Sequence, residues 1–353
     1  MADEFIDMDK HPHERRPLVP GTDPGGLQPI GLGPRVPMLV ISPWSTGGFV
    51  CSETFDHTSV LQFLEKRFDL PEPNINKWRR SICGDLTSAF DFLGTSNPAA
   101  VKFPVPAVLV SEKQPYSVPQ RQSMPTQEPG VRPARALPYV LYTHSRIEAD
   151  RGKVFIDFRN EGKAGAAFYA RNNILPQLAP RRYSISAGQN LTDYWLLSDN
   201  GSEVDPKQPG SEPDYDISLY GPNGFYSQFR GVAVSPQSHE NEDNDGVKAQ
   251  PSPEAVIQYD AITGDIHLTF TNIGKAPSTL NVTNAYAASE SPHQFHVNPG
   301  ETAEDHWARA STHNWFDLSI ACPESPLFKR RFAGHVETGG PSTSDPALSR
   351  EES

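Results

Sequence analysis

Three neighbouring residues, Asp56, His57 and Thr58, are the catalytic candidates of this sequence. A carboxylate beside an imidazole can take part in binding an anion, and the apolar pattern that follows predicts a helix whose positive N-terminal end favours phosphate. Under this interpretation the residues line a phosphate site. The competing interpretation is that Asp56 caps the helix and His57 packs or hydrogen-bonds locally. We favour the second, because Asp is a preferred capping residue.

Two tryptophans, Trp44 and Trp78, are the candidates for substrate binding. Indole faces attract quaternary ammonium groups, so the pair would suit an aromatic cage. We favour burial in a core for each, since aromatic side chains supply much of a core's buried area. Arg79 and Arg80 could contact a phosphate bidentately. Solvation, or an ion pair with a neighbour such as Asp85, is the interpretation that we favour for them.

Possible metal ligands are scattered along the chain. Several histidines near the C-terminus share no known metal-site spacing with a carboxylate, namely His293, His296, His306 and His313. The acidic run at residues 239–246 gathers hard oxygen ligands suited to calcium, but it lacks EF-hand spacing and the closing glutamate. We expect scattered histidines and a solvated acidic loop, and the residues themselves support no metal ion or other cofactor.

The elements that would position the candidates begin with an α/β piece. Residues 37–42 are a short apolar run between turn residues, which predicts a buried strand, in a parallel sheet. A helix is expected from Asp56 to Glu65. One strand and one or two helices cannot bury both faces of a sheet, so the piece looks like the tail of something larger. Prolines then recur through residues 95–138, which is typical of an extended linker.

The rest of the chain contains a tandem duplication. Residues 158–164 align with residues 270–276, and at the same offset Asp193-Tyr194-Trp195 aligns with Asp305-His306-Trp307. Alternating segments between Asn/Gly turns, such as residues 153–158 and 265–270, predict short antiparallel strands. Copies of about 90 residues with this pattern are typical of β-sandwiches.

Composition limits the class of protein. The 353 residues include 35 prolines and 26 glycines, which excludes a helical bundle. A formal charge of −12 makes nucleic acid an unsuitable partner, because it repels polyphosphate backbones. No apolar run of about 18 residues predicts a transmembrane helix, and residues 1–16 lack the pattern of a secretory signal.

Three segments, residues 31–45, 55–60 and 78–92, resemble the phosphocholine-preferring bacterial phospholipases C. Residues 215–225 look like the signature of the β-rich module that these enzymes carry in two copies. The resemblance covers roughly residues 30–336 and implies an α/β remnant of an alkaline-phosphatase-like domain followed by two all-β sandwich repeats. The expected boundaries are 1–94 for the phosphoesterase portion, 95–137 for the Pro-rich linker, 138–234 and 253–338 for the repeats, and 339–353 for a disordered tail.

This resemblance implies a secreted, metal-dependent hydrolase of phosphodiester bonds in phosphatidylcholine- or sphingomyelin-like lipids. Its partner would be a phospholipid head group or a membrane surface, bound peripherally. The family's nucleophile and acidic metal-binding motif are expected upstream of Gly31, and nothing before Gly31 reproduces that motif. We therefore expect this chain alone to be incomplete and inactive. A non-catalytic lipid- or protein-binding β-sandwich module and a truncated gene product are the alternatives.

Overall fold

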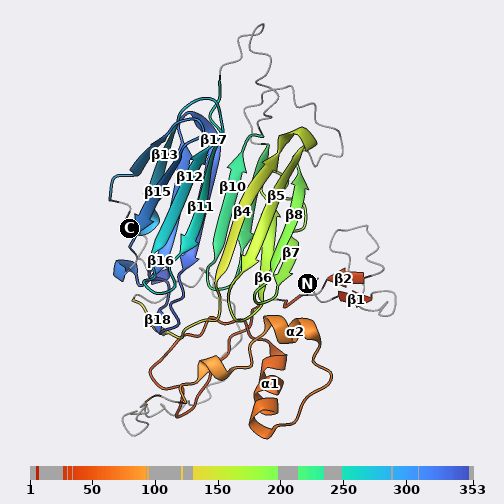
Figure 1. Cartoon of the computed structure of the whole chain (residues 1–353). Helices are drawn as coiled ribbons and strands as arrows, with labels where there is room; N and C mark the ends of the chain where they lie inside the picture. The colour runs from red at the N-terminus through yellow and green to blue at the C-terminus, as the bar shows by residue number, and fades with distance from the viewer. Residues whose placement is uncertain are drawn as a thin grey trace.

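The computed structural model describes residues 5–7, 27–29, 31–33, 35–92, 94, 121, 130–197, 214–233, 249–287, 289–308 and 310–349. In this part of the chain most secondary structure is β-strand, and the two α-helices lie together at one end of the molecule (Figure 1). The expected β-rich architecture is confirmed. A short hairpin, β1 (Phe5–Asp7) with β2 (Leu27–Pro29), comes first in the chain.

Each repeat supplies strands in the same order. The first repeat contains β4 (Leu141–Glu148), β5 (Lys153–Asn160), β6 (Ala166–Asn172), β7 (Arg181–Ile185), β8 (Asn190–Leu196), β9 (Tyr215–Tyr220) and β10 (Tyr226–Gly231). The second contains β11 (Pro253–Tyr259), β12 (Ile266–Asn272), β13 (Ser278–Asn284), β14 (His293–Val297), β15 (Thr302–Trp307), β16 (Trp315–Cys322) and β17 (Ser325–His335). The short 3₁₀ turns are η2 (Thr87–Ala89), η4 (Ala149–Arg151), η6 (Ala285–Ala287), η7 (Ala310–Thr312) and η8 (Pro346–Ser349).

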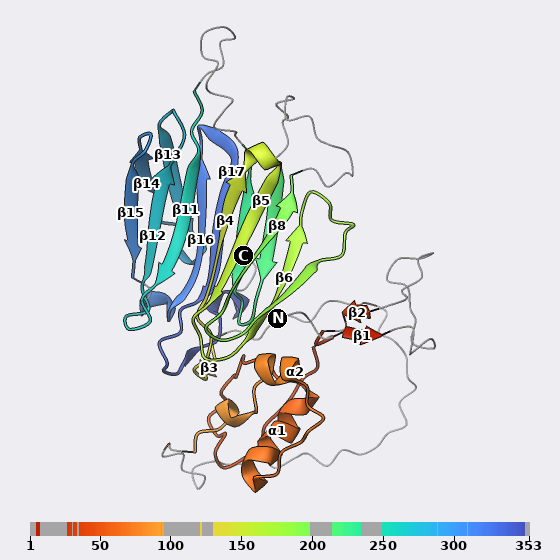
Figure 2. The same ribbon diagram turned by 45° about the vertical axis from the view of Figure 1, so that its right-hand side comes forward.

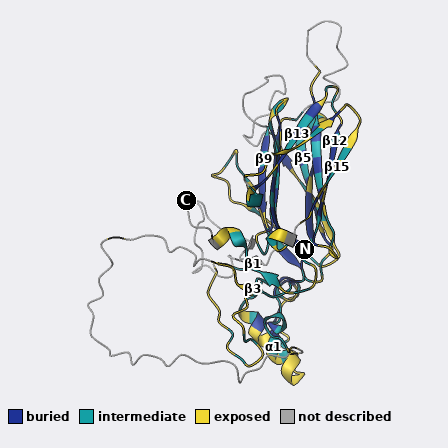
Figure 3. Ribbon diagram, turned by 90° about the vertical axis from the view of Figure 1, so that its left-hand side faces the viewer, coloured by how far each residue is buried: buried dark blue, intermediate teal, exposed yellow. Residues whose placement is uncertain are grey.

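The two repeats share one large sheet. The sequence predicts one sandwich for each repeat, but the structure forms a single eight-stranded sheet in the order β14-β13-β16-β17-β10-β9-β6-β7. Two three-stranded sheets, β4-β5-β8 and β11-β12-β15, cover the halves of the large sheet that belong to their own repeats (Figure 2). The molecule is therefore a two-layer structure with one hydrophobic core that runs through both repeats (Figure 3).

The junction strands β10 and β17 pair antiparallel about a local two-fold axis. Gln228 lies opposite Arg331, while Phe229 lies opposite Arg330 and Ser227 lies opposite Phe332. Because Phe229 and Phe332 are equivalent positions of the duplication, each strand presents the same register to the other. Closing the two edges against each other leaves neither strand unpaired, which removes two exposed sheet edges.

A buried arginine lies under this junction. Arg330 is fully buried and donates from Nε to Glu254 Oε1 at 2.6 Å and from Nη2 to Glu254 Oε2 at 2.7 Å. Its Nη2 also donates to the Tyr215 hydroxyl at 3.0 Å. The guanidinium therefore joins β9 of the first repeat to β11 of the second. The nearby carboxylate keeps the pKa of Arg330 above its usual range, although burial acts in the opposite direction.

The repeated Asn-x-Gly motif has a structural cause. The Asn160 amide donates to the carbonyls of Ala164 at 2.9 Å and Ile185 at 3.0 Å, and it accepts from the amide N–H of Gly162 at 2.9 Å. Asn272 makes the equivalent three bonds, to Ala276 at 2.8 Å, Val297 at 3.0 Å and Gly274 at 3.0 Å. A Cβ on either glycine would lie 2.3 Å from backbone atoms of the preceding segment, so only glycine fits.

The helical segment, residues 35–92, packs at one end of the first repeat (Figures 1 and 2). It contains α1 (His57–Phe68) and α2 (Lys77–Ile82). The helix predicted after Asp56 is confirmed as α1, which ends at Asp69 in a left-handed conformation. Strand β3 (Pro133–Ala134) ties the entry of the β-module to this segment, through hydrogen bonds of 2.8 Å in each direction between Val50 and residues 133 and 135.

Three expectations from the sequence concern residues 37–42, the tail at residues 339–353 and the acidic run at residues 239–246. Residues 37–42 form no strand, and Leu39 and Ile41 are each 88% exposed, so the predicted buried strand is wrong for this chain. The predicted disordered tail has secondary structure over part of its length, because β18 (Ser342–Thr343) pairs with β3 and η8 follows it. The acidic run at residues 239–246 lies outside the described residues.

Candidate functional site

Asp56 caps helix α1. Its Oδ1 accepts hydrogen bonds from the Thr58 amide at 2.8 Å and from the Thr58 hydroxyl at 2.6 Å. The Ser59 hydroxyl accepts from the Asp56 amide at 3.0 Å, which completes a capping box. This reciprocal arrangement satisfies N–H groups at the start of the helix that have no partner within it. The sequence signal for the helix start is therefore explained by local structure.

Arg79 of α2 forms an ion pair with the second carboxylate oxygen of Asp56. Burial alone would raise the pKa of Asp56, but the Thr58 hydrogen bonds and the Arg79 guanidinium outweigh it and hold that pKa below its usual range. A carboxylate with a lowered pKa is a weak proton acceptor. This geometry holds α1 against α2 and leaves Asp56 poorly suited to activate the Thr58 hydroxyl. His57, the first helical residue, is exposed.

Trp44 and Trp78 lie in different environments. Trp78 is buried with Ile82 and Cys83, and its indole N–H donates to the Ser184 hydroxyl at 2.9 Å. Trp44 is exposed, with its ring centroid 5.9 Å from that of Phe92. The Trp78 ring packs between α2 and the first repeat. Of the two tryptophans, Trp44 is therefore the one whose ring is exposed.

Helix α2 packs on small residues of the first repeat. The Gly165 amide donates to the Ser81 carbonyl at 2.9 Å, and a Cβ at this glycine would lie 2.5 Å from the same carbonyl oxygen. Ala167 packs on the cluster around Trp78, beside the hydrogen bond to Ser184. At the equivalent positions the second repeat carries the bulkier Pro277, Thr279 and His296, whereas α1 and α2 lie at the end of the first repeat.

The outward face of the helical segment is apolar. Val60, Leu61, Leu64 and Phe68 of α1 are exposed, and they recur at the three- and four-residue spacing of one helix face. The buried residues of the same helix are the polar Ser59 and Gln62. In Figure 3 part of α1 has the colour of exposed residues, whereas long stretches of the strands have the colour of buried ones. Val36, Met38, Leu39 and Ile41 of the same segment are exposed as well, and we call these side chains and those of α1 the apolar surface of the helical segment.

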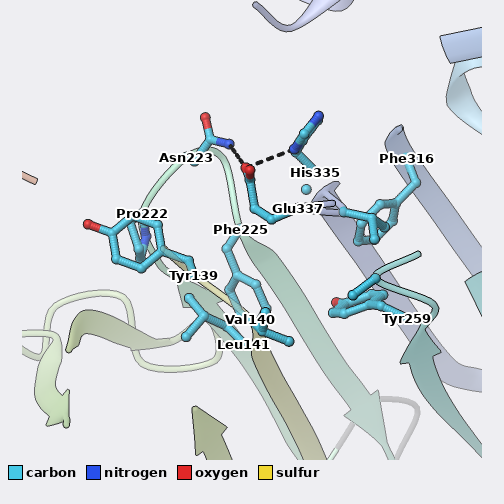
Figure 4. Close-up of a pocket in the computed structure, with 13 residues that line it drawn as sticks. Tyr139, Val140, Leu141, Pro222, Asn223, Phe225, Tyr259, Phe316, His335 and Glu337 are labelled. Carbon is cyan, nitrogen blue, oxygen red and sulfur yellow. Dashed lines mark hydrogen bonds and ion pairs between the residues drawn. The ribbon is translucent and has the colours of Figure 1, made fainter. Parts of the chain in front are cut away.

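A pocket lies where the two repeats meet (Figure 4). It holds about 450 Å³ of empty space, part of which is open to solvent, and its lining includes Tyr139, Phe225, Tyr259, Phe316, His335 and Glu337. Glu337 Oε1 accepts from His335 Nδ1 at 2.8 Å and from Asn223 Nδ2 at 3.3 Å, and Oε2 accepts from the Leu137 amide at 3.1 Å. The carboxylate therefore has partners from three segments and joins them.

Sequence reasoning missed His335 and Glu337. The nearest signal is the module signature at residues 215–225, which contributes Asn223 and Phe225 to the pocket. Tyr139 of this lining bonds through its hydroxyl to the Thr54 amide at 2.9 Å, and burial raises its pKa to about 12. The Glu337 carboxylate and the Tyr139 hydroxyl are thus already hydrogen-bonded, and they connect the two repeats with each other and with the helical segment.

The described residues do not fit a divalent metal ion. Among them no group of three or more His, Cys, Asp or Glu side chains is arranged to hold one. His293 pairs with Asp305 at 3.3 Å and His306 pairs with Asp265 at 3.1 Å. We assign no catalytic step to a metal in this part of the molecule. Likewise, no helix among the described residues has the length and apolar character to cross a membrane.

Comparison with known proteins gives consistent matches. The model of the bacterial phospholipase C C-terminal domain matches residues 133–232 and 253–335, and that of the phosphoesterase family matches residues 8–71. A protein named non-hemolytic phospholipase C from Burkholderia pseudomallei is 43% identical over 333 residues, covering 91% of this chain and 44% of the relative. The non-hemolytic and hemolytic phospholipases C of Pseudomonas aeruginosa are 40% and 33% identical over 328 and 374 residues, covering 91% and 95% of this chain.

The chain spans 44% of the length of both non-hemolytic relatives and 50% of the hemolytic one. One family model takes in the two β-repeats, and the other takes in residues 8–71, which include α1 and end before α2. The duplication found in the sequence coincides with the two matched segments of the C-terminal domain. The chain therefore belongs to the bacterial phospholipase C family of phosphoesterases.

Proposed function

We propose that this chain serves the hydrolysis of phosphodiester bonds in phosphatidylcholine- or sphingomyelin-like lipids, as the C-terminal portion of a phospholipase C. In this proposal the β-module carries the helical segment, and the helical segment binds the rest of a phosphoesterase domain that supplies the nucleophile and the metal ligands. The support from comparison is 43% identity to a protein named phospholipase C, over 91% of this chain.

The observation that carries the proposal is the uncovered apolar surface of the helical segment. Leu39 and Ile41 are each 88% exposed, and α1 of the same segment also has large apolar side chains exposed. Covering apolar side chains such as these is favourable by about 25 cal/mol per Å² of surface removed from water, so a partner that covers them is expected. The apolar pattern of residues 37–42 suits a strand within a sheet, so the partner would be an α/β domain with a free strand edge.

The opposite side of the same segment is firmly attached. Trp78, Gly165 and Tyr139 take part in polar contacts of 2.9 Å between the helical segment and the β-module. Because these contacts attach the helical segment to the β-module, the exposed apolar side chains of the segment are already in position for binding. This lowers the entropy cost of binding. The β-module would thus present the segment to the remaining domain.

The test is hydrolysis of a chromogenic phosphocholine ester, with divalent metal or EDTA added. This chain would be assayed alone and mixed with the portion of the Burkholderia relative that lies outside the match. The expected result is turnover only in the mixture. Ile41→Glu should abolish that turnover, while the matched control Ile262→Glu should not, because Ile262 is 91% exposed in the second repeat, away from this surface.

Two outcomes would contradict the proposal. Turnover by the chain alone that Asp56→Ala or Thr58→Ala abolishes would place the catalytic centre at the start of α1. Equal turnover by mixtures containing Ile41→Glu and Ile262→Glu would show that the apolar surface has no role in assembly. A non-catalytic lipid- or protein-binding module is the second candidate, and vesicle binding without turnover in any mixture would favour it.

A further inference from the structure

Each β-repeat has an open side, where the edge strands of its two sheets face each other. In repeat 1 these strands are β7 of the large sheet and β8 of the small sheet. In repeat 2 they are β14 and β15, which lie at the outer edge of the molecule (Figure 2). Side chains that reach from one edge strand to the other cover the hydrophobic core at this side and shield it from water.

The open side of repeat 1 is closed by Arg181 of β7. Its Nη1 lies 3.2 Å from Asp193 Oδ2 on β8, and its guanidinium carbon lies 4.5 Å from the ring centroid of the buried Trp195. The Tyr183 hydroxyl, also from β7, donates to Asp193 Oδ2 at 2.6 Å. Asp193 therefore has two partners from the other sheet, and one of them is a guanidinium, which keeps its charge across the physiological pH range.

The open side of repeat 2 has the same arrangement, with a histidine in place of the arginine. The equivalent positions carry His293 on β14 and both Asp305 and Trp307 on β15. His293 Nδ1 lies 3.3 Å from Asp305 Oδ2, and the imidazole stacks on the Trp307 ring with centroids 4.1 Å apart and planes 23° apart. We call His293 and Asp305 the rim pair of repeat 2.

The rim pair is the one polar link between Asp305 and the other sheet in the described part of the chain. The remaining donors to Asp305 are the His306 amide at 2.8 Å and an indole N–H, and both belong to β15 itself. The position of Tyr183 is taken by Phe295, which has no hydroxyl group. Asp305 thus depends on His293 alone for a polar contact across the open side.

Burial makes the Asp305 carboxylate sensitive to the charge of its partner. Its side chain is 11% exposed, whereas that of Asp193 is 36% exposed. A mostly buried carboxylate loses more than an exposed one when its cationic partner becomes neutral, because less water is present to replace the interaction. The loss of a proton from His293 should therefore weaken the closure of repeat 2.

The other charged groups on the strands around β14 do not span the open side. Asp265 and His267 of β12 contact His306 of β15, within the small sheet. On β14 itself, His296 Nδ1 lies 3.3 Å from a threonine hydroxyl. On β13 the residue opposite His293 is an apolar valine. The rim pair is therefore the contact across this side whose strength depends on the charge of a histidine.

We propose that the rim pair makes the open side of repeat 2 respond to pH, while Arg181 keeps the open side of repeat 1 closed. Imidazole side chains lose their proton between about pH 5 and pH 8, whereas carboxylates stay ionised over that range. The protonated ring gives Asp305 a charge-assisted hydrogen bond and is attracted to the face of Trp307. Both attractions are present at low pH and are lost as pH rises, so β14 separates from β15 more often at high pH. This device goes beyond the proposed function, because it requires neither turnover nor a partner domain.

The experiment is amide hydrogen exchange of the full chain, followed for peptides from each strand between about pH 5.5 and pH 8. Strand β10, in the middle of the large sheet, serves as the internal reference, because intrinsic exchange rates change with pH in the same way along the whole chain. Relative to this reference, the protection of β14 should fall by about three- to fivefold over the range. The protection of β7 relative to β10 should stay constant.

Three variants identify the group responsible. His293→Arg gives repeat 2 the residue that repeat 1 carries, so the fold accommodates it, and the pH dependence of β14 should disappear. Arg181→His makes the reverse exchange and should give β7 a pH dependence of the same sign. The matched control, His306→Gln, removes the other histidine–aspartate pair of the small sheet and should leave the pH dependence of β14 unchanged.

The same measurements contain the outcomes that contradict the proposal. A pH dependence of β14 that persists in His293→Arg, or that His306→Gln removes, would overturn it. So would protection of β14 that stays constant with pH in the original chain, or an equal pH dependence of β7 and β14 in that chain.

Discussion

The two β-repeats share a backbone and differ on their surfaces. Asn160 and Asn272 make the same three hydrogen bonds, and strands β10 and β17 pair in a symmetric register. On the outer sheets, however, Phe155 and Tyr194 are replaced by His267 and His306. The comparison separates what the fold requires from what it permits, since only the shared features are needed to form the sheets.

A second difference concerns what each repeat can bind within the chain. The helical segment packs on the first repeat, where Gly165, Ala167 and Ser184 allow α2 to approach closely. At these positions the second repeat has Pro277, Thr279 and His296, whose side chains would occupy the same space. Small residues on one copy therefore decide where the phosphoesterase part of the chain is held.

The largest effect on the free energy of unfolding is expected at the junction between the two repeats. Glu254→Gln leaves the fully buried Arg330 without its carboxylate, so the free energy of unfolding should fall by about 3–5 kcal/mol. The equivalent position in repeat 1 is Tyr142, and Tyr142→Phe should change that free energy by less than about 1 kcal/mol. Denaturant unfolding measures both. Similar losses for the two variants would contradict the assigned role of the ion pair.

The shared asparagines should behave alike. Asn160→Ala and Asn272→Ala each remove three hydrogen bonds and leave buried carbonyl groups unpaired, so each should cost about 2–3 kcal/mol of unfolding free energy. The two values should agree within about 0.5 kcal/mol, because the environments are equivalent. Denaturant titration of both variants is the measurement. A large effect at one site and none at the other would show that the motif is not a common structural device.

Changing the surface on which α2 packs should affect the stability of α2 and leave the strands unchanged. Ser184→His gives the first repeat the residue of the second and removes the acceptor of the Trp78 indole, which should cost the docked state of α2 about 2 kcal/mol. Amide hydrogen exchange of α2 should then quicken by at least about tenfold while the strands keep their protection. The reverse change, His296→Ser in the second repeat, should leave α2 unaffected. Unchanged exchange in α2 after Ser184→His would remove the proposed cause of the asymmetry.

The smallest expected effect is a pH-dependent loss of stability of α1, in the helical segment that packs on the first repeat. The pKa of Asp56 is lowered in the fold, so its contribution is present above the unfolded value of about 3.9 and is lost as pH falls through the lower folded value. Asp56→Asn should destabilise α1 by about 1 kcal/mol at pH 7 and much less near pH 2. Hydrogen exchange at pH 7, with circular dichroism across the acid range, checks this. A difference that stays constant with pH would contradict it.

How far the sequence predicts this molecule can be judged from particular residues. The helix cap at Asp56 and the equivalence of Asn160 with Asn272 are local or repeated signals, which the sequence contains directly. The pairing of β10 with β17 is not predictable in this way, because a strand pattern does not say which edge it meets. The apolar run at residues 37–42 predicts a buried strand because such a run indicates a covered surface, but it does not say what covers it. The role of Glu337 gives no local signal, since two of its partners, Leu137 and Asn223, lie in distant segments.

The central proposal is that this chain acts as the C-terminal portion of a phospholipase C and that its helical segment binds the rest of the phosphoesterase domain. Its most direct test is hydrolysis of a chromogenic phosphocholine ester by the chain alone and by the chain mixed with the portion of the Burkholderia relative that lies outside the match. The account predicts turnover only in the mixture. Turnover by the folded chain alone would contradict it.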